Sequence, residues 1–148
     1  MSIWWSLHLR REAASVPLAR RLLLGTMETA GVDPDVSYDL SVALTEACAN
    51  AVEHGGATGS GPASEAYRVT AYLDGETCRI EVADAGPGFA GVARPAAAVA
   101  SDAESGRGLR LIEELADHVH FGRTGRGGAL VSFDKIVKWR ADAPLALT

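Results

Sequence analysis

Hydrophobic and polar residues alternate at the start of the chain, which predicts a strand with one buried face. The residues expected on that face are Ile3, Trp5, Leu7 and Leu9. Apolar residues then recur at helical spacing over residues 16–30, and Gly31 is expected to end this helix. Its apolar positions are Leu18, Leu22, Leu23 and Met27.

A second helix is predicted to begin near Asp33 and Pro34, because a capping residue followed by proline is typical of a helix start. The helix should run to about His54. Its apolar stripe consists of Leu40, Leu44, Ala47 and Ala51. The following segment, residues 55–64, is rich in glycine and serine and is predicted to be a flexible loop.

The second half of the chain contains two predicted hairpins separated by a long segment. In the first hairpin, alternating residues form the buried faces and residues 74–76 form the turn. Those buried residues are Tyr67, Val69, Ala71, Leu73, Cys78, Ile80 and Val82. Residues 87–105 have no clear period, which is typical of a functional lid. A helix over residues 109–116 and strands over residues 119–123 and 129–133 should follow.

This order of elements predicts an α+β fold. We expect a two-layer sandwich, in which a mixed, mostly antiparallel sheet carries its helices on one face. Residues 1–139 should form a single domain, and residues 140–148 a loose C-terminal tail.

Composition narrows the classes of function. The net charge of −5 argues against direct binding of nucleic acid, because domains that bind phosphate backbones are usually basic. Apolar runs stay short of the ~18 residues that predict a membrane span, and the first residues do not resemble a signal peptide. We therefore expect a cytoplasmic protein without membrane contact, in which Cys48 and Cys78 are reduced.

The second helix carries the first candidate site residues. Glu46, Asn50 and His54 are spaced four apart, so they lie along one side of the helix next to the apolar stripe. The amide oxygen of Asn50 suits magnesium, which prefers oxygen ligands. Glu46 lies one turn earlier and could orient or deprotonate a hydroxyl that attacks a bound phosphate. The alternative is an ordinary solvated helix face.

Two glycine-containing segments complete the candidate site. Asp84 ends a predicted strand, where its carboxylate could accept a hydrogen bond from the exocyclic amine of adenine. Gly86 and Gly88 follow it. A simple turn is the alternative. The second segment comes just before the predicted third helix, where exposed backbone N–H groups favour phosphate. It contains Gly106, Arg107, Gly108 and Leu109, and a capped loop is the alternative reading.

Taken together and in this order, the motifs resemble those of the GHKL (histidine-kinase-like) ATPase superfamily. Residues 44–55 look like its N-box, residues 84–89 like its first glycine box and residues 106–109 like its second. Within the superfamily the chain is most similar to the bacterial anti-sigma factor serine/threonine kinases, which are single small domains. Their pattern E-A-x-x-N-A-x-x-H-G matches residues 46–55.

The resemblance implies a Bergerat-type ATP-binding fold and a function. Such a protein uses ATP and Mg²⁺, sequesters a sigma factor and phosphorylates an anti-anti-sigma protein. Glu46 would match the catalytic base, Asn50 the magnesium ligand and Asp84 the adenine contact. The remaining nucleotide contacts would be Gly86 and Gly88 at the adenine and Gly106, Arg107, Gly108 and Leu109 near the phosphates.

An alternative function and the assembly of the protein remain to be considered. The chain could be an ATP-binding regulatory module that controls a partner without efficient phosphoryl transfer. Family members of this kind are often homodimers. Trp4 lies on the predicted outer face of the first strand, so we expect it to take part in a homodimer interface, with packing beneath the tail as the alternative.

Overall fold

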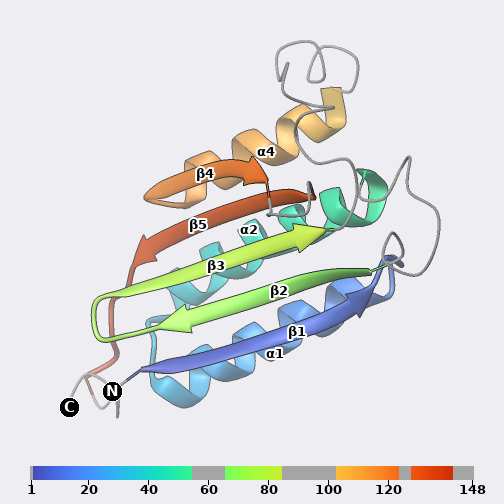
Figure 1. The fold of residues 1–148 in the computed structure, drawn as a ribbon. Coiled ribbons are helices and arrows are strands. Elements are labelled where there is room, and N and C mark those ends of the chain that lie inside the picture. Colours follow the sequence, from blue (N-terminus) through green and yellow to red (C-terminus); the bar gives the residue numbers. More distant parts are fainter. Residues whose placement is uncertain (1, 55–65, 85–102, 124–127, 142–148) are drawn as a thin grey trace.

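The structure is a computed structural model that describes residues 2–54, 66–84, 103–123 and 128–141. The described residues form five strands and three helices, coloured along the chain in Figure 1. In order they are β1 (Ile3–Arg10), α1 (Ser15–Ala30), α2 (Pro34–His54), β2 (Ala66–Leu73), β3 (Thr77–Asp84), α4 (Ala103–Leu115), β4 (His118–Arg123) and β5 (Ala129–Ile136). The predicted loop over residues 55–64 lies outside the described residues, as does the predicted lid up to residue 102.

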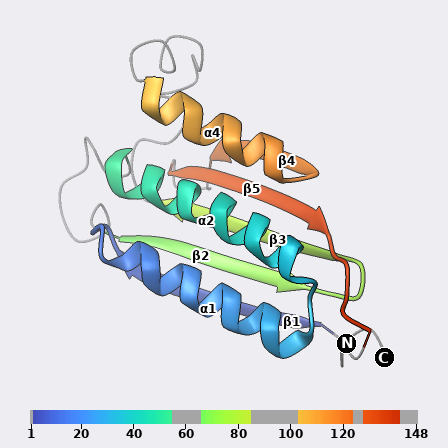
Figure 2. The ribbon, with the colours of Figure 1, turned by 180° about the vertical axis from the view of Figure 1, so that it is seen from behind.

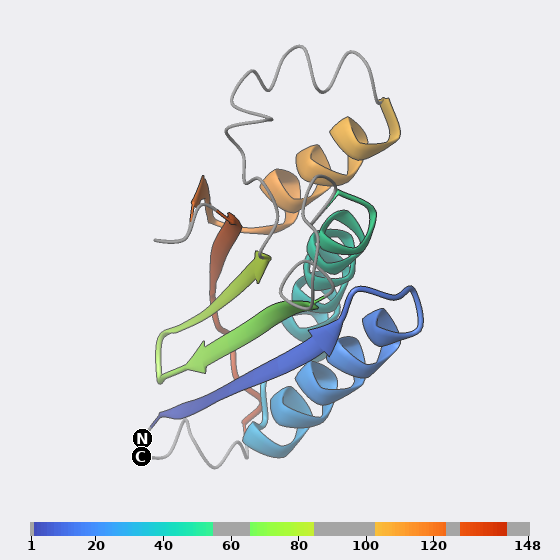
Figure 3. The ribbon, with the colours of Figure 1, turned by 45° about the vertical axis from the view of Figure 1, so that its right-hand side comes forward.

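The strands form one sheet in the order β1-β2-β3-β5-β4, and every pairing between these described strands is antiparallel. Figures 2 and 3 show that α1, α2 and α4 all cover the same face. The α+β class with helices on one face is therefore confirmed. The hydrophobic core fills the space between the two layers, with α2 packed between α1 and α4.

Helix α1 buries a different stripe from the one predicted. Residues four apart face the sheet, namely Ser15, Ala19, Leu23 and Met27. Leu18 and Leu22 are 52% and 40% exposed, so their assignment to the buried stripe was wrong. Each precedes a buried residue by one position, which places it about 100° away around the helix. Gly31 ends α1 with a φ of 92°, as predicted.

Helix α2 buries all four residues of its predicted stripe and begins at Pro34. Helix α4 differs from the prediction, because it begins at Ala103 rather than near Leu109. The prediction placed the start of the helix after Gly106 and Gly108, because glycine has low helix propensity. Tertiary packing outweighs that cost, since Ile112 is fully buried against the core.

The end of β5 is attached to the connection between α1 and α2. Val32 forms an isolated bridge with Trp139, and the N–H of Arg140 donates to the carbonyl of Gly31 at 2.9 Å. The Arg140 guanidinium also donates to the carbonyl of Glu28 at 3.1 Å. Arg140, which the sequence analysis assigns to the loose tail, is thus bound to α1. Residues 142–148 lie outside the described residues, so the looseness of the tail stays a prediction.

Candidate functional site

The elements that carry the candidate residues meet at one end of the molecule. Figure 1 shows the last turn of α2, the end of β3 and the first turn of α4 on the same side of the fold. Helix α2 packs against both α4 and β3, so its position is fixed relative to both. Glu46 and Asn50 on α2 and Asp84 at the end of β3 are thereby brought to this end.

Asn50 shows an unusual feature for a folded domain. Its amide nitrogen Nδ2 is buried and has no hydrogen-bond partner within the described part of the chain. Buried polar groups are nearly always paired, and leaving one unpaired costs roughly 1–3 kcal/mol. Asn50 also lies one helical turn after Glu46, and both side chains are half-buried. An unpaired amide beside a carboxylate is the arrangement expected where a polar ligand completes the site.

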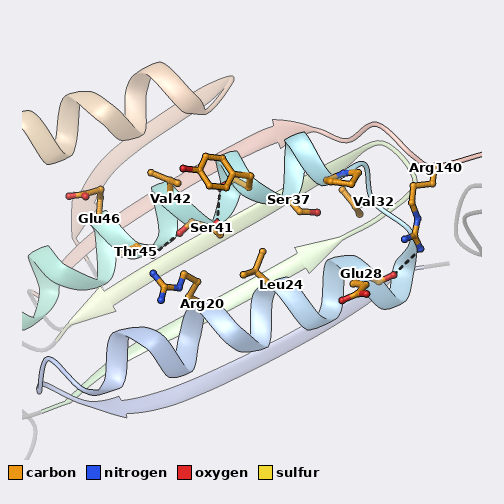
Figure 4. A pocket seen from close by; sticks show the side chains of 12 residues that line it. Arg20, Leu24, Glu28, Val32, Ser37, Ser41, Val42, Thr45, Glu46 and Arg140 are labelled. Carbon is orange, nitrogen blue, oxygen red and sulfur yellow. Dashed lines mark hydrogen bonds between the residues drawn. The ribbon is translucent and has the colours of Figure 1, made fainter.

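Glu46 lies at one end of a surface groove between α1 and α2, with Glu28 and Arg140 at the other end (Figure 4). The groove has a volume of about 690 Å³. Its lining is mixed, with apolar side chains in the middle and charged ones at the ends. Near Glu46 the lining residues are Arg20, Val42 and Thr45. A polypeptide segment lying in this groove would reach Glu46 from the surface.

Asp84 is the last residue of β3 and is held by the neighbouring strand. Its Oδ1 accepts the backbone N–H of Ala129 in β5 at 3.3 Å. Across β2 its register partner is Tyr67, so the two side chains share the inner face of the sheet. The carboxylate therefore stands at a strand end, on the inner face of the sheet, and is held by the backbone of β5.

A buried polar chain lies next to Asp84 on the inner face. The Tyr67 hydroxyl and Ser15 Oγ are 2.6 Å apart, and Ser15 Oγ donates to the carbonyl of Glu12 at 2.7 Å. Burial raises the pKa of Tyr67 and of the Cys48 thiol to about 12 each, and a hydrogen bond joins these two side chains. Both groups therefore stay neutral near pH 7 and act as structural supports.

The glycine motifs are only partly described. Gly86 and Gly88 lie outside the described residues, so their role at the base stays a prediction. The expectation that residues 106–108 precede the helix was wrong, because they lie within α4. Leu109 is half-buried and packs against the hydrophobic core.

The donor set fits magnesium better than a metal held by protein alone. Among the described residues there is no group of three or more His, Cys, Asp or Glu side chains that could hold a metal ion. Magnesium is commonly bound through one or two protein oxygens, with water and substrate phosphates completing its shell. Asn50 could supply one such oxygen. None of the described helices is both long and apolar enough to cross a membrane.

The family assignment comes from the match of residues 9–135 to the sequence model of the histidine kinase-like ATPase domain. The chain belongs to this family. A serine-protein kinase, RsbW of Bacillus licheniformis, is 33% identical over 113 residues, which cover 71% of this chain and 69% of the relative. The resemblance to the anti-sigma factor kinases is thus confirmed at the level of the family.

Two solved structures share the fold. One is a Mycobacterium tuberculosis structure of RsbU and RsbW domains, with a TM-score of 0.63 and 21% identity; the match covers 90% of this histidine kinase-like chain but only 33% of the other. The second is the SiaB–SiaC complex from Pseudomonas aeruginosa, with a TM-score of 0.54, 14% identity and 89% coverage of both chains. At these identities the likeness supports the fold alone.

Sequence reasoning missed several residues that shape the site. They are Arg11, Ser15, Tyr67 and Ala129. Tyr67 was placed on a buried strand face, but nothing in the local pattern pairs its hydroxyl with a serine 52 positions earlier. Ala129 acts through its backbone N–H, which carries no side-chain signal at all.

Proposed function

We propose that this protein is an ATP- and Mg²⁺-dependent anti-sigma factor with serine/threonine kinase activity. It would phosphorylate an anti-anti-sigma protein and sequester a sigma factor in the cytoplasm. The observation that carries the proposal is the pair of Glu46 and Asn50, which lie one turn apart on α2, with Glu46 also lining the end of the groove. The similarity to the serine-protein kinase RsbW supports the same function.

Each candidate residue has a role in this proposal. Asp84 accepts a hydrogen bond from the exocyclic amine of adenine, and Gly86 and Gly88 border the base. The amide oxygen of Asn50 holds the magnesium that accompanies the phosphates. Its Nδ2, which is unpaired among the described groups, is left to donate a hydrogen bond to the bound nucleotide. Backbone groups of residues 106–109 contact the phosphates. When bound, Mg-ATP supplies the phosphoryl group that is transferred.

Glu46 performs the step that makes the protein an enzyme. Its carboxylate would orient the serine or threonine hydroxyl of the partner and accept its proton, while the γ-phosphoryl group of ATP passes to that oxygen and ADP leaves. The groove between α1 and α2 gives that partner a path to Glu46 (Figure 4). A pure nucleotide sensor would have no use for a carboxylate at this position.

Both partners of this protein are expected to be other proteins. They are inferred from the similarity to RsbW, and the shared fold of SiaB in its complex with SiaC is consistent with a protein partner. The alternative is a regulatory module that binds ATP and a partner without efficient transfer. This alternative is compatible with the 33% identity to the kinase relative, because a shared fold and ATP site do not require efficient transfer.

The decisive experiment compares Glu46→Gln with wild type. We expect the variant to bind Mg-ATP with nearly unchanged affinity, because Glu46 contacts the acceptor and not the nucleotide. Phosphorylation of an anti-anti-sigma protein from the same genome neighbourhood should fall by on the order of 10²–10⁴-fold. Radiolabelled ATP measures the transfer and titration calorimetry the affinity.

The matched control is Glu28→Gln, which removes a carboxylate from the opposite end of the same groove. This variant should transfer phosphate at close to the wild-type rate. Equal rates for Glu46→Gln and wild type would remove Glu46 from the chemistry. If wild type binds Mg-ATP but transfers phosphate to no candidate partner, the regulatory-module alternative replaces the kinase.

A further inference from the structure

The turn between β1 and α1, residues 11–14, lies at the same end of the molecule as the candidate site (Figure 1). Its backbone is tightly closed. The N–H of Glu12 donates to the carbonyl of Arg10 at 2.8 Å, and the N–H of Ser15 donates to the carbonyl of Glu12 at 3.0 Å. Nothing in the sequence motifs draws attention to this turn.

Arg11 connects this turn to the end of α2. Its Nη1 donates to the carbonyl of Val52 at 2.9 Å, across 41 positions of sequence. Val52 is one of the last four residues of α2, whose carbonyls have no partner within the helix. A cation at this position also opposes the partial negative charge at the C-terminal end of the helix. The contact therefore stabilises the last turn of α2 against fraying.

The same turn is braced on its other side. Ser15 Oγ donates to the carbonyl of Glu12 and lies 2.6 Å from the Tyr67 hydroxyl, a contact that is buried. Tyr67 in turn is the register partner of Asp84. The turn and the first residue of α1 thus contact both the end of α2, close to Asn50, and the strand beside Asp84.

We propose that Arg11 is a positioning residue for the magnesium side of the nucleotide site. Asn50 is two residues before Val52, so fraying of the last turn of α2 would displace its side chain. By holding Val52, Arg11 keeps the Asn50 amide aligned with the metal that accompanies the phosphates. This inference rests on the proposed binding of Mg-ATP.

The neighbouring arginine provides a matched control. The Arg10 side chain is 86% exposed and lies 4.0 Å from Glu12, an exposed contact that contributes little. Arg10→Ala and Arg11→Ala remove the same charge from adjacent positions, but only the second removes the contact to Val52. Arg11→Lys keeps the charge and one donor.

The test measures ATP affinity with and without magnesium, and backbone hydrogen exchange in the last turn of α2 without nucleotide. For Arg11→Ala we expect the gain in affinity from magnesium to fall by roughly tenfold, as is typical when a residue that orients a metal ligand is removed. Affinity without magnesium should change little, and exchange in the last turn should accelerate. Arg11→Lys should recover part of both, and Arg10→Ala should match wild type.

Several results would overturn the inference. One is an Arg11→Ala variant that matches Arg10→Ala in both measurements. Another is an equal loss of affinity with and without magnesium, which would show a general structural role. If wild type does not bind Mg-ATP at all, the proposed function fails, and the exchange rates alone then decide whether Arg11 holds the end of α2.

Discussion

Asp84 illustrates how single residues gain a role from their backbone neighbours. A carboxylate at the end of a strand could rotate freely, but the N–H of Ala129 holds Oδ1 at 3.3 Å. Asn50 differs from Asp84, since its buried Nδ2 has no hydrogen-bond partner in the described part of the chain. The Asp84 carboxylate is therefore held by the protein, whereas the Asn50 amide nitrogen is available to bind a ligand.

At this scale the proposal makes a prediction about base selection. Wild type should bind ATP at least about tenfold more tightly than GTP, because guanine presents a carbonyl where adenine presents an amine, and two facing acceptors are left unpaired. Asp84→Asn should reduce this preference, since an amide can donate to the guanine carbonyl. Competition titrations with the two nucleotides measure the ratio.

Glu81→Gln serves as the control, because Glu81 is on the outer face of the same strand. It should keep the wild-type preference. Equal affinity of wild type for ATP and GTP would count against Asp84 as the adenine contact.

The residue-level predictions from sequence succeeded where spacing within one element was enough. Glu46 and Asn50 could be placed together because four residues make about one helical turn. The contacts of Arg11 with Val52 and of Ser15 with Tyr67 join residues 41 and 52 positions apart. Local periodicity contains no information about such pairs, since they depend on how the elements pack.

At the scale of elements, the existence and type of every described helix and strand could be predicted, and boundaries less well. Alternation and helical spacing are strong signals in β1, β2 and α2, where one face is buried and the other polar. In α1 the leucines did not identify the buried stripe, since three of them are exposed. In α4 the glycines concealed the first turns of the helix.

Gly108 gives the prediction that belongs to this scale. Alanine should raise the free energy of unfolding by roughly 0.5–1 kcal/mol, because glycine is unfavourable inside a helix. In an α-helix, the N–H of a residue this far from the start pairs with a carbonyl four residues earlier. Gly108→Ala should therefore weaken ATP binding, if the first turns must open for backbone groups to reach the phosphates. Chemical denaturation and calorimetry give the two quantities.

Gly25→Ala in α1 is the control. Gly25 is inside a helix, and a Cβ there would meet nothing within 4 Å. This variant should gain similar stability and keep its ATP affinity. A Gly108→Ala variant that gains stability without losing affinity would show that α4 binds the phosphates without opening.

At the scale of the whole molecule, the two faces of the sheet are unequal. The helices cover one face, whereas the other exposes large side chains among the described residues. Trp4 and Tyr72 are 59% and 41% exposed, and their ring centroids lie 6.2 Å apart. Aromatic clusters of this kind are typical of interaction surfaces.

We therefore expect a homodimer that uses this face. Trp4→Ser should shift the protein toward monomer, because it removes the largest exposed apolar side chain of the cluster. Light scattering over a range of concentrations measures the change. Tyr38→Ser is the control, since Tyr38 is 66% exposed but lies on the helical side. A wild-type monomer at high concentration would refute the dimer.

The chain enters and leaves the described fold at the end opposite to Asp84. β1 begins there, and Val32 and Trp139 pair there, whereas the last turn of α2 and the end of β3 point the other way (Figure 1). A label, a solid support or a fused protein attached near Ile3 or Trp139 would therefore leave the opposite end facing solution. Immobilised protein should remain suitable for measuring the binding of nucleotides.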